Sequence, residues 1–427
     1  MAGSESTIGA LLDETGGSIK TGPFGTKLKA SEYTPTGVPV ISVGEVGFGR
    51  LRVHHDTPRV DVTVSSRMPE FLLKAGDIVF GRKGAVERSA QVQPDEDGYF
   101  LGSDGIRIRL NVEECDPKFI SYQLQTTAHR SWMIQHAAGT TMPSLNEGII
   151  RRIPIVLKPL AEQKAIAAVL GALDDKIELN RRMNATLEAM ARTLFQSWFV
   201  DFDPVRAKLD GRDPVGLDPA TAALFPDHFD HRAEGVVPTG WRATTLCEVI
   251  EISDSKRIPL SGREREARQG KYPYHGAASV MDYVDDFLFD GIYTLMGEDG
   301  SVINENGTPV LQYVWGKFWV NNHAHVLRGK NGISTEHLLL HLKSSNITPF
   351  VNGAVQPKLN QGNMNRIPFM LPPPEIGQAF AKTIDPLFAQ IRANTDQSRT
   401  LATLRDALLP KLLSGELSVA NMDKRYN

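Results

Sequence analysis

Two stretches of the chain carry residues spaced alternately four and three positions apart, the repeat of a coiled-coil helix. They occupy residues 166–198 and 380–412 and are mostly apolar. Since both patterns keep one register over about 35–40 residues, they predict two long paired helices of about 55–60 Å. The predicted seam residues are Ile166, Leu170, Leu173, Ile177, Asn180, Asn184, Leu187 and Leu194, then Phe380, Ile384, Leu387, Ile391, Asn394, Ser398, Leu401 and Leu408.

Prolines and a glycine mark the ends of these helices. Pro159 precedes the first pattern, and a run of three prolines at residues 372–374 precedes the second. Proline is tolerated in a first helical turn because its missing N–H would have no partner there. Pro410 and Gly415 are expected to kink and then end the second helix.

Polar residues interrupt both patterns near their midpoints, at Asn180, Asn184, Asn394 and Ser398. A buried asparagine in a seam costs stability but fixes register and orientation. If the helices pack antiparallel, the four residues can share one polar layer. The alternative is that the helices bend or expose this stretch to water.

The segment before each helix is also duplicated. GTTMPSLNEGIIRRIPIVLKP begins at Gly139, and GAVQPKLNQGNMNRIPFMLPP begins at Gly353, an offset of 214 residues without a gap. The helical patterns follow the same offset. The small residues and the proline predict a tight loop, which is either a joint between globule and helix or a contact to a DNA backbone.

Short apolar runs broken by glycine and proline precede each duplicated segment and predict strands. They lie at residues 38–43, 77–80 and 105–110, and again at 293–296, 310–315 and 318–327. A helix is expected at 118–135 and another at 335–344. The linker, residues 201–229, is rich in proline and aspartate and is expected to be mostly irregular.

The fold class is therefore α+β, with two α/β globular regions separated by two long helices in an internal pseudo-two-fold repeat. The scaffold is duplicated, whereas the globules differ in sequence. The predicted divisions are residues 1–158, a first globule; 159–200, a helix; 201–240, a linker; 241–372, a second globule; 373–415, a helix; and 416–427, a tail.

Composition narrows the class of protein. Hydrophobic residues make up 41% of the 427 residues and charged residues 23%, which is typical of globular proteins. No apolar run approaches a membrane span, the N-terminus lacks the pattern of a secretory signal, and two cysteines allow no disulfide framework. We expect a cytoplasmic protein without a membrane partner. The net charge of −3 does not indicate a nucleic-acid binder, although local patches decide DNA contact more than the total.

Two unlike globules at a fixed separation suggest a protein that recognises two sites on one ligand. Duplex DNA is such a ligand, because successive faces of its major groove recur every ~34–36 Å. Basic residues are the first candidates for DNA contact, with surface charge as the alternative for each. In the first globule they are Lys27, Arg50, Arg52, Arg82, Lys83 and Arg88, joined by Thr140 and Thr141 of the duplicated loop. In the second they are Lys256, Arg257, Arg263, Arg265, Arg268, Lys271 and Tyr274, joined by Lys358.

His323 and His325 alternate along a predicted strand and would share one face, as two metal ligands could. No third ligand stands at a characteristic spacing, so we expect a packed or hydrogen-bonded pair and no metal site. Enzyme motifs for phosphate binding or for amino-methyl transfer are missing from the sequence. The segment 162–164, Glu-Gln-Lys, has only a weak likeness to a nuclease motif. We expect no catalytic residues.

With these features the chain resembles the specificity subunits of type I restriction–modification systems. The segments that carry the resemblance are GPFGTKL at Gly22, GDIVFGRKG at Gly76, both loop segments, EQKAI at Glu162, WFVDFDPVRAK at Trp198, YPYHGA at Tyr272, GEDG at Gly297 and FWVNNHAHVL at Phe318. They span nearly the whole chain.

The resemblance implies two target-recognition domains, each reading one half of a bipartite asymmetric DNA site. It implies that the long helices are an antiparallel coiled-coil spacer that also docks two modification subunits, which methylate adenine at N6. It places S-adenosylmethionine, ATP and Mg on partner subunits, the restriction subunits included, and no cofactor in this chain. Two other hypotheses stay open: a self-contained DNA methyltransferase or nuclease, and a structural coiled-coil adaptor.

Overall fold

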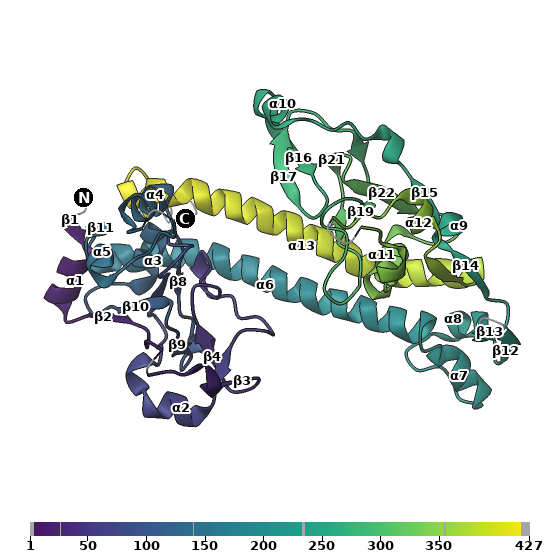
Figure 1. Cartoon of the computed structure of the whole chain (residues 1–427), viewed down its shortest axis with the longest axis horizontal. Helices are drawn as coiled ribbons and strands as arrows, with labels where there is room; N and C mark the ends of the chain where they lie inside the picture. Colours follow the sequence, from purple (N-terminus) through teal and green to yellow (C-terminus); the bar gives the residue numbers. More distant parts are fainter. Residues whose placement is uncertain (1–3, 26, 140, 233–234, 354–355, 420–427) are drawn as a thin grey trace, which may run out of the picture. The chain divides into compact units, whose positions relative to one another are not determined.

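The computed structural model describes residues 4–25, 27–139, 141–232, 235–353 and 356–419. The chain divides into two compact units, Met1–Glu178 with Ser398–Asn427, and Leu179–Gln397. We call residues 4–158 the first head and residues 241–372 the second head. Each head belongs to one unit, and each unit also contains part of both long helices (Figure 1).

The first head is built on two sheets. The larger has the strand order β2-β10-β7-β8-β5, antiparallel except for β5 with β8, and the smaller has the order β3-β6-β4-β9, with β4 and β9 parallel. A separate pair joins β1 to β11. The strands are β1 Ser4–Thr7, β2 Ser18–Thr21, β3 Tyr33–Thr34, β4 Val38–Ile41, β5 Gly49–Arg50, β6 Arg59–Val60, β7 Ile78–Gly81, β8 Ser89–Gln91, β9 Phe100–Leu101, β10 Gly105–Arg109 and β11 Pro154–Leu157.

Short helices cover these sheets. The helix expected at 118–135 is wrong as a single element, because the chain breaks at Gln125 and Thr126. The Thr126 side chain caps the new helix by accepting from the His129 N–H, and such local capping competes with helix continuation. The helices are α1 Ile8–Thr15, α2 Val62–Arg67, α3 Pro117–Leu124, α4 Thr127–His136 and α5 Glu147–Arg151, with 3₁₀ turns Ala30–Glu32, Pro69–Phe71 and Pro94–Glu96.

The second head repeats this plan. Its sheets have the orders β15-β22-β19-β20 and β17-β16-β21-β18, with β16 and β21 parallel, and β14 pairs with β23. The run expected at 318–327 is two strands, because a turn at residues 322–323 separates them. The strands are β14 Arg242–Thr245, β15 Ile250–Ile252, β16 Gln269–His275, β17 Val280–Val284, β18 Phe289–Asp290, β19 Tyr293–Gly297, β20 Leu311–Val314, β21 Lys317–Val320, β22 Ala324–Gly329 and β23 Pro368–Leu371.

The strand orders correspond in large part, since β2-β10-β7-β8 has the counterpart β15-β22-β19-β20 and the parallel pair β4–β9 has the counterpart β16–β21, so the heads share a fold although their sequences differ. The helices of the second head are α9 Leu246–Val249, α10 Gly262–Ala267, α11 Thr335–Ser344 and α12 Gln361–Asn365, with 3₁₀ turns Asp254–Lys256 and Thr348–Phe350. The expectation of a mostly irregular linker needs correction. It contains α7 Asp203–Leu209 and α8 Pro219–Leu224, each with a proline in its first turn, and is followed by the hairpin of β12 Phe229–Arg232 and β13 Gly235–Pro238.

Both predicted long helices are present, as α6 Leu160–Phe199 with 40 residues and α13 Pro374–Ser414 with 41 (Figure 1). The second helix continues through Pro410 and ends before Gly415, whose φ of 82° lies in the left-handed region that glycine tolerates. Among the residues that the structure describes, no helix is both long and apolar enough to cross a membrane.

The predicted seam residues are all buried or half-buried. In the first unit, Ile166 and Leu170 of α6 share a core with Leu409 and Leu412 of α13. In the second unit, the end of α6 packs against the start of α13. Trp198 lies 5.3 Å from Phe380, between ring centroids, and 5.1 Å from Phe225 in an edge-on arrangement. Within each unit the two helices therefore run antiparallel.

Three of the four predicted polar residues meet in the second unit. Asn394 Nδ2 donates to Asn184 Oδ1 at 2.9 Å, and Asn180 Nδ2 donates to the Asn394 carbonyl at 3.3 Å. The layer also includes Thr395 and Gln397, which accept from Asn184 and Asn180 at 3.0 and 2.8 Å. These bonds form only in one register, so they select it. Ser398 belongs to the first unit.

Replacing Trp198 tests the seam. Trp198 is 2% exposed, so Trp198→Ala leaves a cavity between α6 and α13 and should lower the free energy of unfolding by about 3–5 kcal/mol. Urea denaturation followed by circular dichroism measures the change. Val200→Ala is the control, since Val200 is 45% exposed and its truncation should change stability by less than about 0.5 kcal/mol. Equal effects of the two variants would contradict the described packing.

Candidate nucleic-acid interface

The duplicated loop of the first head is fixed to the turn that follows β7. Ala138 and Ser144 exchange N–H···O bonds of 2.9 and 2.8 Å, and Gly139 has a φ of 92°. The Leu145 N–H donates to the Arg82 carbonyl at 2.8 Å, and the Gly84 N–H donates to the Pro143 carbonyl at 2.9 Å. These bonds tie the loop to the turn after β7 within the same head, so the loop has a structural role.

Side chains at this loop are nevertheless available to a ligand. Thr141 is exposed, whereas Thr140 lies outside the described residues. The Arg82 guanidinium lies 5.0 Å from the ring centroid of Phe24, which is 57% exposed, and its Nη1 donates to the Ser103 carbonyl at 3.1 Å. Lys83 Nζ lies 3.4 Å from Asp104 Oδ1. An oriented guanidinium, an amine and an exposed ring suit contacts to bases and phosphates.

A second group of cations in the first head surrounds Phe48. The guanidinium groups of Arg88 and Arg130 lie 5.9 and 4.3 Å from the Phe48 ring centroid, and this ring is 42% exposed. Sequence reasoning selected Arg88 and missed Arg130 and Phe48. The sequence carried no signal for Arg130 and Phe48, because these residues and Arg88 come from three separate segments of the chain.

The other candidates of the first head differ in surroundings. Lys27 and Arg52 are exposed, with the Lys27 amine 5.6 Å from the Phe71 ring centroid. Arg50 is a different case, because its Nη2 donates to Asp175 of α6 at 2.8 Å. This contact makes Arg50 a link between the first head and the helix.

The basic stretch of the second head is mostly engaged in its own ion pairs. Arg265 Nε lies 3.2 Å from Asp282, and Arg268 Nη2 lies 2.9 Å from Asp285. Arg257 Nη1 donates to Glu298 and to the Ala324 carbonyl, both at 2.7 Å. Tyr274 is 1% exposed, so its ring has no face for a base. These four side chains hold the head together.

The exposed cations of this stretch remain the candidates for DNA contact: Lys256, Arg263 and Lys271. Apolar side chains that the sequence analysis did not select are also exposed in this head. They are Ile258 at 49%, Met281 at 55% and Tyr283 at 52%. Met281 and Tyr283 both belong to β17, in which Val284 alone is buried.

The described residues of the duplicated loop in the second head make the same backbone hydrogen bonds as those of the first. Asn352 and Lys358 exchange N–H···O bonds of 2.8 Å, and the Leu359 N–H donates to the Glu298 carbonyl at 2.9 Å. The candidate Lys358 is exposed, and its Nζ lies 3.2 Å from Asp299 Oδ1.

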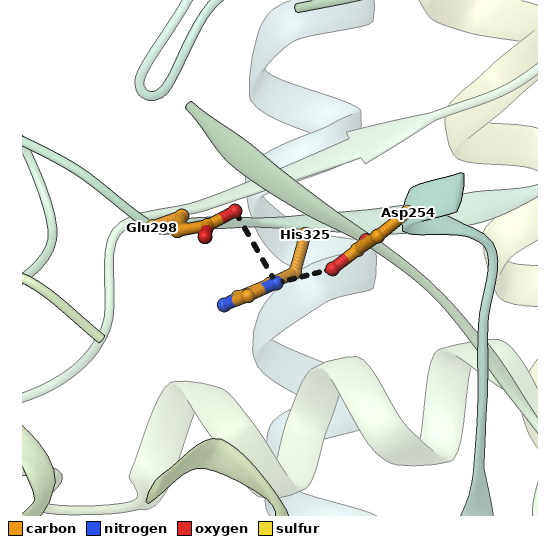
Figure 2. Close-up of side chains that lie close together, drawn as sticks. All are labelled: Asp254, Glu298 and His325. Atoms are coloured by element: carbon orange, nitrogen blue, oxygen red, sulfur yellow. Dashed lines mark hydrogen bonds and ion pairs between the residues drawn. The ribbon is translucent and has the colours of Figure 1, made fainter. Parts of the chain in front are cut away.

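Figure 2 shows Asp254, Glu298 and His325 close together inside the second head. His325 Nδ1 lies 2.6 Å from Asp254 Oδ2 and 3.7 Å from Glu298 Oε2, while Nε2 lies 2.8 Å from the Leu359 carbonyl. Acidic and histidine ligands of this kind can hold a metal ion. Here Asp254 Oδ2 and the Leu359 carbonyl lie within hydrogen-bond distance of the two ring nitrogens, so both nitrogens already have partners in the protein.

Arg257 completes the neutralisation of this cluster, since it contacts both Glu298 and Asp254. Burial raises the pKa of Asp254, but the hydrogen bond and charge of His325 and the N–H groups of Val326 and Gln361 outweigh it, so the pKa stays below its ordinary value. His323 is exposed, with Nδ1 3.8 Å from Asp299. The expected pairing of the two histidines is therefore wrong, because each has its own acidic partner.

A polar network that the sequence analysis missed joins the first head to the helices. Tyr122 donates to Asp174 of α6 at 2.6 Å, and Arg405 of α13 donates to the same carboxylate at 2.7 Å. Burial raises the pKa of Tyr122, and the Asp174 carboxylate raises it further. The only signal for this network in the sequence was Arg405, a charged residue at a position where the heptad pattern predicts an apolar one.

The second head has its own network to α13. Tyr313 donates to Glu336 at 2.7 Å, and Arg392 contacts both residues. Trp315 Nε1 donates to Asp396 Oδ2 at 3.0 Å. Both heads are thus attached to long helices through partly buried charges.

Known proteins share this arrangement. The family model described as the type I restriction modification DNA specificity domain matches residues 24–189 and 238–402. The chain belongs to this family. Each matched stretch contains most of one head and most of the helix that follows it, so the family unit is a head with its helix, present twice.

Individual relatives agree with this assignment. The chain is 27% identical over 337 residues to the type I restriction enzyme MjaIX specificity subunit of Methanocaldococcus jannaschii, covering 75% of this chain and 73% of that protein. It is 26% identical over 411 residues to the HindI specificity subunit of Haemophilus influenzae, with coverage of 81% and 87%. A crystal structure of the S subunit of a type I restriction–modification system from M. genitalium shows the same fold, with a TM-score of 0.56, 17% identity and coverage of 96% and 95%.

The buried cluster of this family member gives a stability prediction. Asp254→Asn leaves His325 and Arg257 without a full countercharge and should cost about 3–5 kcal/mol at neutral pH. Because the folded-state pKa of Asp254 is lowered, its contribution is present above the unfolded pKa of about 4 and is lost as pH falls through the folded-state value. The difference between variant and parent should therefore shrink in acid.

Urea denaturation of both proteins from pH 7 to pH 3 measures this effect. Asp282→Asn is the matched control, since Asp282 forms a more exposed pair with Arg265 in the same head and should give a much smaller loss. A penalty for Asp254→Asn that does not change with pH would show that its charge does not stabilise the head.

Proposed function

We propose that this chain is a DNA-recognition subunit whose two heads each read one half of a bipartite duplex site. The observation that carries the proposal is the repetition of head and helix in one chain. The two heads share a fold and a duplicated loop, and their exposed side chains differ. One fold with two sets of side chains suits two unlike half-sites.

The long helices would set the spacing between the half-sites. At 1.5 Å per residue, a 40-residue helix is about 60 Å long, enough to span more than one turn of DNA of about 34–36 Å. The polar layer of Asn180, Asn184 and Asn394 supports a single register in the second unit, as a spacer requires.

The chemistry would belong to partner subunits. The curated relatives are named as specificity subunits of type I restriction enzymes, which supports partners that modify and cleave DNA. We propose two modification subunits that methylate adenine at N6 with S-adenosylmethionine, and restriction subunits that use ATP and Mg, all acting on cytoplasmic DNA. The cluster that most resembles an enzyme site, around His325, is neutralised by Arg257.

Mapping of N6-methyladenine in host DNA tests the proposal. A strain with the gene should carry one two-part methylated motif, and a strain without it should lose that motif while others remain. Supplying the gene again should restore it. If every methylated motif persists after deletion, the chain does not direct methylation. A purified chain that methylates or cuts DNA alone would favour the enzyme alternative.

The spacer proposal has its own test. One heptad inserted into α6 after Glu178 and one into α13 after Gln397 adds about 10 Å to both helices. The gap between half-sites should then grow by about three base pairs, given a rise of about 3.4 Å per pair, with neither half-site changed. Methylation mapping reads the result, and an insertion that changed the bases read would contradict the spacer.

A further inference from the structure

The fold of the first head gathers one exposed aromatic ring and two guanidinium groups from three separate segments. Phe48 precedes β5 and Arg88 precedes β8, and these two strands are parallel, with Gly49 opposite Ala90. Parallel pairing places the residues that precede both strands side by side. Arg130 comes from α4. We call Phe48, Arg88 and Arg130 the Phe48 cluster.

Helix α4 reaches Phe48 because the corner between α3 and α4 packs on the chain at Gly49. Gly49 has a φ of 80°, and a Cβ atom there would lie 2.6 Å from Gln125 Oε1. Only glycine fits both this backbone conformation and this close approach. Arg130 follows the corner, and its guanidinium lies 4.3 Å from the ring centroid of Phe48. The position of the cluster is therefore set by the packing of the head.

The two arginines lack the partners that guanidinium groups usually have within a fold. Arg130 forms no side-chain hydrogen bond or ion pair with any residue that the structure describes. Arg88 has one weak ion pair, in which its Nε lies 3.9 Å from Glu87 Oε1. The Nε atoms of both arginines are buried without a hydrogen-bond partner. Partly dehydrated cations without a close anion are costly, and two like charges at one ring also repel each other.

The cluster is open to a ligand that could supply the missing anion. Phe48 is 42% exposed, and the Arg88 side chain is 39% exposed. A guanidinium presents N–H donors in a planar fork that matches the oxygens of a phosphate. The aromatic ring adds apolar contact area beside these donors. Two such groups around one exposed ring suit a phosphate backbone with its sugars.

The elements that carry the cluster distinguish the first head from the second. Within the described part of the second head, the sheet β15-β22-β19-β20 ends at the counterpart of β8, so β5 is not repeated. Between α11 and the duplicated loop, the second head has the 3₁₀ turn Thr348–Phe350 where the first has α4. The three residues of the cluster also lie outside the segments that carry the family resemblance.

We propose that Arg88 and Arg130 each bind a phosphate of the DNA backbone at the half-site read by the first head, an inference that rests on the proposed function. The exposed part of the Phe48 ring lies against a neighbouring deoxyribose. Because phosphates are alike at every base pair, these contacts add affinity and position the first head on the duplex without selecting bases. The second head holds its half-site without this cluster.

The salt dependence of DNA binding tests this inference. The chain is purified in complex with its modification subunits, and fluorescence anisotropy measures its binding to a labelled duplex with the mapped two-part motif, from about 50 to 200 mM salt. Arg88→Gln and Arg130→Gln should each weaken binding about ten-fold. Each should also make the slope of log K against log salt less steep by about 0.9. Arg130→Lys keeps a cation and should keep the slope.

Methylation mapping of the same variants separates a phosphate contact from a base contact. Loss of a phosphate contact weakens binding to duplexes with and without the motif by the same factor. Both half-sites and the gap should therefore stay unchanged in Arg88→Gln and Arg130→Gln. A base position relaxed by either variant would show that the cluster reads a base, and the assignment to phosphate would be wrong.

Two further variants separate the cluster from a general effect of charge. Lys74→Gln removes an exposed positive charge before β7, at the end of that strand away from Arg88, and should leave affinity and slope unchanged. Phe48→Ala keeps the charge of the head but removes the ring, so it should weaken binding. Thermal unfolding checks that all variants fold.

Failure of this inference can be told apart from failure of the proposed function. If the parent complex shows no preference for a two-part motif, the proposed function is wrong. If the parent prefers such a motif, and the folded Arg88→Gln and Arg130→Gln variants bind with its affinity and salt slope, only the inference about the Phe48 cluster is wrong.

Discussion

Burial of the apolar stripes on α6 and α13 is the constraint on which the rest of this structure depends. Each helix has about 40 residues, and neither could keep its stripe of leucine, isoleucine and aromatic residues in water. Packing the two stripes together, with core residues of each head at the ends of the seam, removes them from solvent. The heads are therefore parts of the same cores as the helices.

Polar groups within the apolar seam determine the register in which α6 and α13 pack. An all-apolar seam would tolerate shifts of register, whereas the side-chain N–H groups of Asn180, Asn184 and Asn394 find acceptors in this alignment. The networks around Asp174 and Arg392 act in the same way between heads and helices. Buried charges of this kind are costly to leave without partners, so they favour one arrangement over looser alternatives.

Local patterns predicted the elements that depend on local physics. Heptad spacing located both helices, and the exact offset of the duplicated segments predicted that both heads carry the same loop. Prediction from the sequence failed where tertiary contacts determine whether a side chain is exposed or paired. Arg257, Arg265, Arg268 and Tyr274 read as a basic, aromatic DNA surface, yet each is committed to a partner inside the second head. Arg130 and Phe48 were missed for the converse reason, since only the fold brings them together.

The proposed spacer requires the two heads to keep one separation, and a distance measurement tests that requirement most directly. Spin labels at Ser66→Cys and Glu266→Cys, both exposed positions, report the separation of the heads when the exposed Cys247 is replaced by serine. Pulsed electron paramagnetic resonance should give one narrow distance distribution, and it should broaden when Asn184 and Asn394 are both replaced by alanine. A broad distribution in the chain with its asparagines intact would contradict the spacer.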